Sequence, residues 1–257
     1  KFNMIGEIKS FIYYFYDRVF FIKKKIKFKK NKVNFEFIAK DKTSFNWYSD
    51  YNKLASSEID LIKTINYKKI KNVLYCGSHQ SVLPIILSRL YLKKSFFHCV
   101  EAMRYNHEIA KQNIKINGVK KKFKLYNFAI SNKDEILYFD PLKSNSDNTN
   151  NLIFKEKIKA TNISHFFSTI RDLDLIFLDI EGMESKVIPH ILNSNLKKIK
   201  FIFIELHGNK ILSKFNCSNK KIYEILKRYK FKFNILNNRK ILNFKINKIP
   251  INRHYLI

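Results

Sequence analysis

From residue 71 onwards, short runs of apolar residues alternate with segments in which apolar residues recur every three or four positions. The short runs predict buried β-strands at residues 72–76, 96–100, 123–126, 174–179 and 200–208. The longer periodic segments predict helices at residues 82–92, 105–117, 184–192 and 220–229. Because strands alternate with helices, the pattern indicates an α/β fold whose mainly parallel sheet is covered on both faces.

Further segments complete this pattern. Residues 135–139 predict a strand that could form an antiparallel excursion, and residues 231–236 and 240–246 predict two closing strands. The polar stretch at 143–151 has the composition of a surface loop. Gly118 follows the helix at 105–117, where a residue without a Cβ atom can adopt a positive φ.

The first 55 residues differ from the rest and predict an N-terminal extension of helix and hairpin, followed by one domain over residues 56–257. An aromatic stretch leads into a basic block at 23–32. This order predicts either a helix that lies on an anionic membrane or a helix packed on the main domain with a solvated basic turn behind it. Residues 33–48 alternate in part between apolar and polar side chains, which predicts a short hairpin.

The charge of the chain is unusual. Fifty Lys and Arg against 21 Asp and Glu give a formal net charge of +29, far above the magnitude of ~2–8 usual for a small domain. This charge favours partners that carry phosphate, although AT-rich codons would produce the same excess of Lys, Asn, Ile, Phe and Tyr. No known nucleic-acid motif accompanies the charge, so we predict no specific nucleic-acid partner.

A content of 46% hydrophobic residues excludes a disordered chain.

The chain has three widely spaced cysteines, Cys76, Cys99 and Cys217. An odd number without a C-x-x-C pair predicts neither a disulfide framework nor a zinc site and favours a reducing compartment. The most apolar N-terminal stretch, at 11–22, is interrupted by charges and is shorter than the ~20 residues of a membrane-spanning helix. It also lacks the cleavage site of a signal peptide. We therefore expect a cytoplasmic protein, with peripheral contact at the inner membrane face through residues 1–32 as the membrane alternative.

Candidate chemistry lies where the predicted strands end, because ligands of open α/β sheets bind beyond the carboxyl ends of the strands. The first strand is followed by Gly77, which permits a tight turn, and then by the free backbone N–H groups of the next helix. The second strand is followed by Glu101. A carboxylate there could accept hydrogen bonds from both hydroxyls of a ribose, or it could simply cap a helix.

The predicted strand at 174–179 runs directly into three carboxylates and a glycine, Asp179, Glu181, Gly182 and Glu184. Carboxylates beside a buried apolar run must be solvated, paired or functional, because an isolated buried carboxylate is costly. If the chain stays extended, Asp179 and Glu181 point to opposite faces and need not share a role.

Glu205 and His207, two positions apart at the end of the next strand, are expected to point to the same side. A His–carboxylate pair can shuttle a proton near neutral pH. A structural hydrogen bond at the strand end is the alternative for His207. Asp, Glu and His ligands could also form a metal site, but we predict none.

Five segments in this order resemble a known family: residues 73–77, 100–101 with 113–118, 126–132, 178–184 and 203–207. They look like the FkbM-type methyltransferases, which depend on S-adenosylmethionine and typically methylate hydroxyl groups of sugars and other secondary metabolites. The resemblance covers about residues 56–207. It implies a Rossmann-like three-layer sandwich with a seven-stranded, mainly parallel sheet and an antiparallel C-terminal strand.

The resemblance also implies residue roles. The residues that would bind the cofactor S-adenosylmethionine are Gly77, Ser78, His79, Glu101, Asn127, Ala129 and Asp179. The candidates for the methyl-transfer pocket and for catalysis are Asp179, Glu181, Glu205 and His207. Either His207 or Glu181 would be the base that helps to deprotonate the acceptor hydroxyl.

The glycine loop departs from the family pattern, which has an Asp two positions before the glycine and Asn-x-Gly after it. Tyr75, His79 and Ser81 occupy those places. Tyr75 cannot supply a carboxylate to the cofactor's ammonium group, and Ser81 adds a Cβ atom where backbone approaches closely. The leading prediction is an O-methyltransferase acting on a hydroxyl of a glycan, glycolipid or similar metabolite. The alternatives are a catalytically inactive module of the same fold that binds a membrane or protein partner, and, on charge alone, an enzyme acting on RNA.

Overall fold

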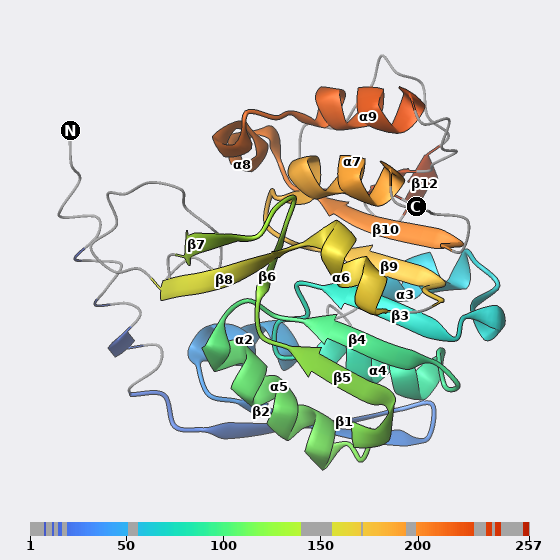
Figure 1. The fold of residues 1–257 in the computed structure, drawn as a ribbon. Helices are drawn as coiled ribbons and strands as arrows, with labels where there is room; N and C mark the ends of the chain where they lie inside the picture. The colour runs from blue at the N-terminus through green and yellow to red at the C-terminus, as the bar shows by residue number, and fades with distance from the viewer. Residues whose placement is uncertain are drawn as a thin grey trace.

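The computed structural model describes residues 20–50, 56–139, 156–170, 172–193 and 199–228, the isolated positions 8, 12, 15 and 16, and the backbone of three short C-terminal strands. Its central sheet contains β3 (Asn72–Cys76), β4 (Phe96–Val100), β5 (Phe123–Tyr126), β9 (Leu175–Leu178), β10 (Phe201–Leu206), β11 (Ile235–Asn237), β12 (Lys240–Leu242) and β13 (His254–Leu256). The strand order is β12-β11-β13-β10-β9-β3-β4-β5 (Figure 1). Five neighbouring strands, from β10 to β5, are parallel, which confirms the predicted α/β fold.

The sheet has eight strands rather than the seven expected. β11 and β12 form an antiparallel hairpin, and β13 lies between β11 and β10, antiparallel to both. The sequence pattern does not predict β13, because three residues are too few to show a strand period. β11 and β12 confirm strands within the closing segments predicted at 231–236 and 240–246. Residues 231–234 and 243–246 lie outside the described part of the chain.

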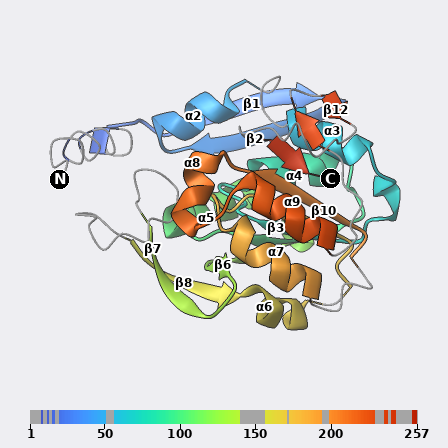
Figure 2. The same ribbon diagram turned by 90° about the horizontal axis from the view of Figure 1, so that it is seen from above.

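Two apolar cores lie on opposite faces of the sheet, since successive side chains of a strand alternate in direction. On β3, Val73 and Tyr75 belong to one core, and Leu74 and Cys76 belong to the other. The first core is covered by α3 (Ser56–Lys63), α4 (Val82–Leu90) and α5 (Arg104–Ile116), and the second by α6 (Ile163–Thr169), α7 (Glu184–Asn193) and α9 (Asn219–Arg228). The three layers are seen end-on in Figure 2.

The N-terminal hairpin lies outside α4 and α5 rather than on the sheet (Figure 2). It consists of β1 (Lys24–Lys30) and β2 (Val33–Ala39) in antiparallel pairing, so the hairpin expected at 33–48 was misplaced. The basic block is a strand and not a solvated turn, because its lysines alternate with Ile26 and Phe28, which face the first core. Residues 42–48 form a helix, α2 (Lys42–Tyr48), with Asp41 as its N-cap.

Asn113 of α5 and Asn117, the C-cap of that helix, join this hairpin to the domain. The Asn113 side chain accepts a hydrogen bond from the N–H of Ile38 at 2.8 Å and donates one to the carbonyl of Gln80 at 3.1 Å. Asn117 donates to the carbonyl of Glu36 at 2.6 Å and accepts from its N–H at 3.3 Å. These side chains satisfy backbone groups of β2 in the way that a neighbouring strand would.

A second, smaller sheet follows β5. Its strands are β6 (Ala129–Ser131), β7 (Glu135–Phe139) and β8 (Glu156–Asn162), in the order β6-β8-β7. β7 pairs antiparallel with β8, which confirms the excursion expected at 135–139. The polar loop expected at 143–151 and the helix expected before residue 20 lie outside the described residues, so the membrane contact stays a prediction. Among the helices that the structure does describe, none has the length and hydrophobicity needed to cross a bilayer.

The cysteines behave as packing residues. Cys76 and Cys99 are free and buried on adjacent strands, and burial raises the pKa of both thiols. Cys217 is also free and is half-buried.

Candidate active site

A cavity of about 460 Å³ opens at the carboxyl ends of β3, β4 and β9. The chain passes from β3 to β4 and β5 on one side and returns to β9 on the other, so the cavity lies where the strand order reverses. Seven of the predicted site residues line it: Gly77, Ser78, His79, Glu101, Ala129, Asp179 and Glu181. The structure therefore brings together residues from four segments that are distant in the sequence.

Gly77 is required by the close approach of two strand ends. Its φ is +82°, and its N–H and that of Ser78 both donate to the carbonyl of Val100 at 3.0 Å. The backbone of Asp179 passes so near that a Cβ atom on Gly77 would lie 1.6 Å from the Asp179 carbonyl oxygen. The β3 turn and the β9 turn can therefore meet only through glycine.

Glu101 lies in the cavity wall with both carboxylate oxygens held by backbone. Oε2 accepts from the N–H of His79 at 2.8 Å, and Oε1 accepts from the N–H of Met103 at 2.9 Å. Burial raises the pKa of Glu101 to about 7, although these two hydrogen bonds act in the opposite direction. The Asn106 side chain donates a third hydrogen bond to this carboxylate. A carboxylate has about four acceptor sites, so Glu101 can still accept a hydrogen bond from a ligand in the cavity.

The wall beyond Glu101 is largely apolar and includes Met103, Phe128, Ala129, Ile130, Leu137 and Phe139. Such a surface suits the flat face of an aromatic base. Asn127, which is predicted on the adenine side, is not among the residues that line the cavity. Its amide donates to the carbonyls of Glu101 and Ala102, both at 3.0 Å, so it fixes the β4 loop rather than lining the cavity.

Three lining residues come from α2 and were missed by sequence reasoning: Thr43, Trp47 and Tyr48. Tyr48 OH hydrogen-bonds His79 Nδ1, and the Trp47 ring lies 5.5 Å from the His79 ring between centroids. Trp47 is half exposed at the cavity. The signal that could have found it is the chain's only tryptophan, set in a segment that precedes the domain.

The turn after β9 is not extended, so the assumption that Asp179 and Glu181 point to opposite faces was wrong. Glu181 has φ +54° and Gly182 has φ +101°. The left-handed turn directs both carboxylates towards one imidazole: His207 Nε2 lies 3.1 Å from Glu181 Oε2 and 3.8 Å from Asp179 Oδ1. Glu184, the first residue of α7, approaches the same ring from the other side, with 3.3 Å between its Oε1 and His207 Nδ1.

His207 is buried among these carboxylates. Burial by itself would lower the pKa of its imidazole, but Glu181 and Glu184 raise that pKa to about 11. In the absence of another cation, these carboxylates therefore favour the protonated imidazolium. A group in this state cannot accept another proton, which leaves Glu181, one-third exposed in the cavity, as the better of the two candidate bases.

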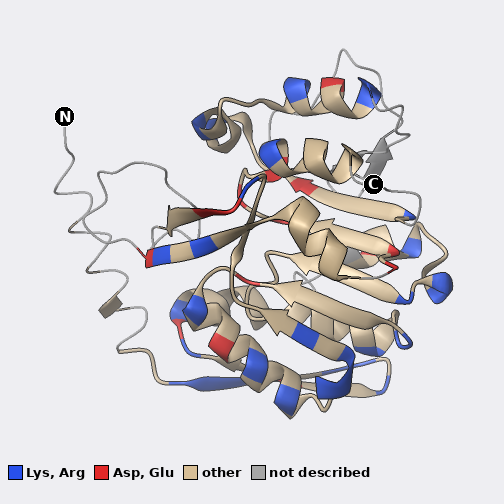
Figure 3. Ribbon diagram, viewed as in Figure 1, with Lys and Arg blue, Asp and Glu red and all other residues tan. Residues whose placement is uncertain are grey.

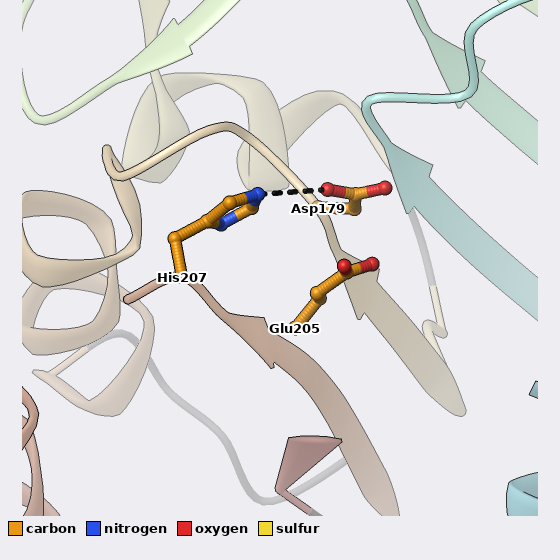
Figure 4. Close-up of side chains that lie close together, drawn as sticks. All are labelled: Asp179, Glu205 and His207. Atoms are coloured by element: carbon orange, nitrogen blue, oxygen red, sulfur yellow. Dashed lines mark ion pairs between the residues drawn. The ribbon is translucent and has the colours of Figure 1, made fainter. Parts of the chain in front are cut away.

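Acidic residues gather here although the chain is strongly basic. Figure 3 shows Lys and Arg along β1 and α5, whereas Asp and Glu mark the carboxyl end of β10 and the start of α7. Four of the 21 acidic residues surround or adjoin His207: Asp179, Glu181, Glu184 and Glu205. Glu205 is buried beside Asp179 and His207 (Figure 4). Glu205 and His207 thus lie behind Asp179 and Glu181 rather than in the cavity lining.

The model of the methyltransferase FkbM domain family matches residues 69–233, well over half of the chain. The chain belongs to the FkbM methyltransferase family. This FkbM domain begins just before β3 and ends after α9, so it contains every residue of the cavity lining except those of α2.

Solved structures give weaker similarities to this FkbM chain. The methyltransferase FkbM of Methylobacillus flagellatus is 11% identical with a TM-score of 0.48, and the match covers 76% of this chain and 47% of that chain. The human methyltransferase 10 domain containing protein is 13% identical with a TM-score of 0.44, over 77% of both chains. TYW2 of P. horikoshii, in complex with MeSAdo, is 14% identical with a TM-score of 0.47, over 90% of this chain and 69% of that chain. A search of the curated proteins gives no significant match.

The unusual glycine loop of this FkbM domain is anchored by α2. His79 and Ser81 have φ of 48° and 56°, so the turn is made by left-handed non-glycine residues. Between them, the Gln80 amide donates to Ser44 Oγ at 2.7 Å and to Asp41 Oδ2 at 3.3 Å. Tyr75, in place of the expected Asp, stacks on Phe177 with 4.7 Å between ring centroids. The cavity stays open beside these substitutions.

Proposed function

We propose that this FkbM protein is an S-adenosylmethionine-dependent methyltransferase that methylates a hydroxyl of a glycan, glycolipid or similar metabolite. The observation that carries the proposal is the convergence of Gly77, Glu101 and Glu181, from three strand ends, on one cavity. Membership of the family supports the class of reaction, and the class of acceptor follows from the family resemblance.

The cavity fits the cofactor. Its volume of about 460 Å³ lies within the range of roughly 300–1,000 Å³ found for small-molecule sites. Glu101 would hold the ribose hydroxyls, the apolar wall around Phe128 and Ala129 would hold the adenine, and the loop at Gly77–His79 would hold the amino-acid part. When bound there, S-adenosylmethionine supplies an electrophilic methyl group on its sulfonium sulfur.

The protein's own residues would position and deprotonate the acceptor. The Glu181 carboxylate reaches the cavity and could take the hydroxyl proton as the oxygen attacks the methyl carbon. The His207 imidazolium, 3.1 Å from Glu181 Oε2, would fix that carboxylate in place. Trp47 and Tyr48 of α2 would limit where the acceptor can lie, and correct placement of the two reactants is itself a large part of catalysis.

Cofactor binding is tested by calorimetry with S-adenosylhomocysteine. Replacing Glu101 with alanine removes a carboxylate that accepts hydrogen bonds from the ribose, so the binding free energy should weaken by about 1–3 kcal/mol. Glu108→Ala is the matched control, since Glu108 is exposed on α5 and away from the cavity. Equal affinities in both variants would remove Glu101 from the site. No binding by the unmodified protein at millimolar ligand would favour the inactive module instead.

The pKa of Glu101 also predicts a pH dependence of stability. Its value of about 7 in the folded protein lies above the 4.5 of an ordinary Glu, so the folded state binds more protons than the unfolded state between these values. Stability from this group is fully present below about pH 4.5 and is lost as pH rises through 7, by about 3 kcal/mol. Urea denaturation at several pH values should show this fall in the wild type and a flatter profile in Glu101→Gln. Parallel profiles would contradict the prediction.

A further inference from the structure

Three buried or half-buried side chains converge below the cavity floor. Asp179 follows β9, Glu205 lies near the end of β10, and His207 follows it, as Figure 4 shows. Each offers one ligand atom, and these atoms all lie within 4.8 Å of one another. Three ligand atoms spaced evenly around one ion, each at about 2.2 Å from it, are about 3.8 Å apart. Shifts of about 0.6 Å or less would therefore bring all three onto one ion.

The surroundings of His207 also favour a cation. The ring is 3% exposed and points towards Asp179 (Figure 4), yet neither ring nitrogen makes a hydrogen bond of normal geometry. Its contacts with carboxylates are ion pairs at 3.1 to 3.8 Å. Two carboxyl groups of this cluster, those of Glu184 and Glu205, are buried with the imidazole, and a buried carboxylate is costly unless a cation or a proton accompanies it.

We propose that Asp179, Glu205 and His207 bind one divalent transition-metal ion between the ends of β9 and β10. Two carboxylate oxygens and one imidazole nitrogen suit ions such as Mn²⁺, Fe²⁺ or Zn²⁺, whereas Mg²⁺ and Ca²⁺ prefer oxygen ligands alone. Binding would replace the proton on His207, because the metal ligand is the neutral imidazole. In the metal-bound protein the ion, in place of the imidazolium, would supply the positive charge beside Glu181.

The position of the ion gives it a role in the proposed reaction, and this part rests on the proposed function. Asp179 is shared between the cluster and the cavity lining, so the ion would lie at the cavity floor. A metal ion lowers the pKa of a hydroxyl bound to it. The acceptor hydroxyl could then pass its proton to the carboxylate of Glu181 before its oxygen forms the new bond to the methyl carbon and the sulfur–methyl bond breaks.

Metal binding is tested directly by electron paramagnetic resonance with Mn²⁺ added to the chelator-treated, full-length protein. One equivalent should bind, and a ¹⁴N modulation in the spin echo should show an imidazole ligand. Glu205→Gln and His207→Gln should each weaken binding at least tenfold, while Glu224→Gln, at an exposed position of α9, should bind as the wild type does. Circular dichroism establishes that each variant is folded.

The wild-type measurements decide the proposal even if a variant fails to fold. Free Mn²⁺ at full signal in the presence of excess protein, or bound Mn²⁺ without a ¹⁴N modulation, would overturn it. Calorimetry with S-adenosylhomocysteine separates this outcome from the proposed function. Mn²⁺ binding without nucleoside binding would retain the metal site and reject the methyltransferase. Nucleoside binding without Mn²⁺ binding would retain the methyltransferase and reject the metal site.

Discussion

The Gly77→Ala protein is expected to lose more than about 4 kcal/mol of unfolding free energy, which is a large part of the roughly 5–15 kcal/mol of an ordinary domain. The new Cβ atom would lie 1.6 Å from the Asp179 carbonyl oxygen, and the obstacle is backbone that cannot rotate away. The φ of +82° adds the usual cost of a left-handed conformation for alanine. Separating the β3 and β9 turns would also break the hydrogen bond from Asp179 N–H to the Cys76 carbonyl.

Gly118→Ala is the matched control. Gly118 has a similar φ of +68°, but a Cβ atom there would meet nothing within 4 Å. Its substitution should cost only the conformational term of about 1–2 kcal/mol. Urea denaturation followed by circular dichroism compares the two variants. Similar midpoints would show that the strand ends do not approach as closely as the structure places them.

The parts of the fold that the sequence predicted are those with long, regular signals. The apolar runs that became β3, β4, β9 and β10 are buried on both faces, so every residue of each run contributes to the signal. The basic block that became β1 was misinterpreted because it is an edge strand whose outer positions are lysines. Lysines on an edge strand protect it from pairing with other chains. In the sequence, however, so many lysines make the alternation of apolar and polar residues difficult to recognise.

The sequence predicted which strand ends form the site, but it did not predict the directions of the side chains there. Parallel strands bring their carboxyl ends to one edge, which is enough to place Gly77, Glu101 and Asp179 together. The direction of the Glu181 side chain depends on the left-handed φ of Glu181 itself. No sequence pattern predicts a left-handed φ at a residue other than glycine. The contribution of α2 depends on where the extension packs, which is set by contacts between segments far apart in the chain, such as Gln80 with Ser44.

Replacing His207 with leucine is expected to cost about 3–5 kcal/mol of unfolding free energy, measured by urea denaturation at pH 7 in chelator-containing buffer. The imidazolium is the partner of Glu184, whose side chain is fully buried, and its removal leaves that carboxylate without a counter-charge in the core. His165→Leu is the matched control, because its ion pair with Asp134 at 2.9 Å is largely exposed. Such a pair contributes at most about 1 kcal/mol.

A double substitution separates lost charge pairing from lost packing. If Glu184 is destabilising only when its partner is absent, then Glu184→Leu in the His207→Leu background should recover part of the lost stability, and the two costs should not add. Additive costs would show that His207 stabilises the protein through its packing alone. The pair would then be an incidental contact and not the reason that α7 begins with a buried glutamate, where the Glu184 carboxylate also accepts a hydrogen bond from the N–H of Ile180 at 2.9 Å.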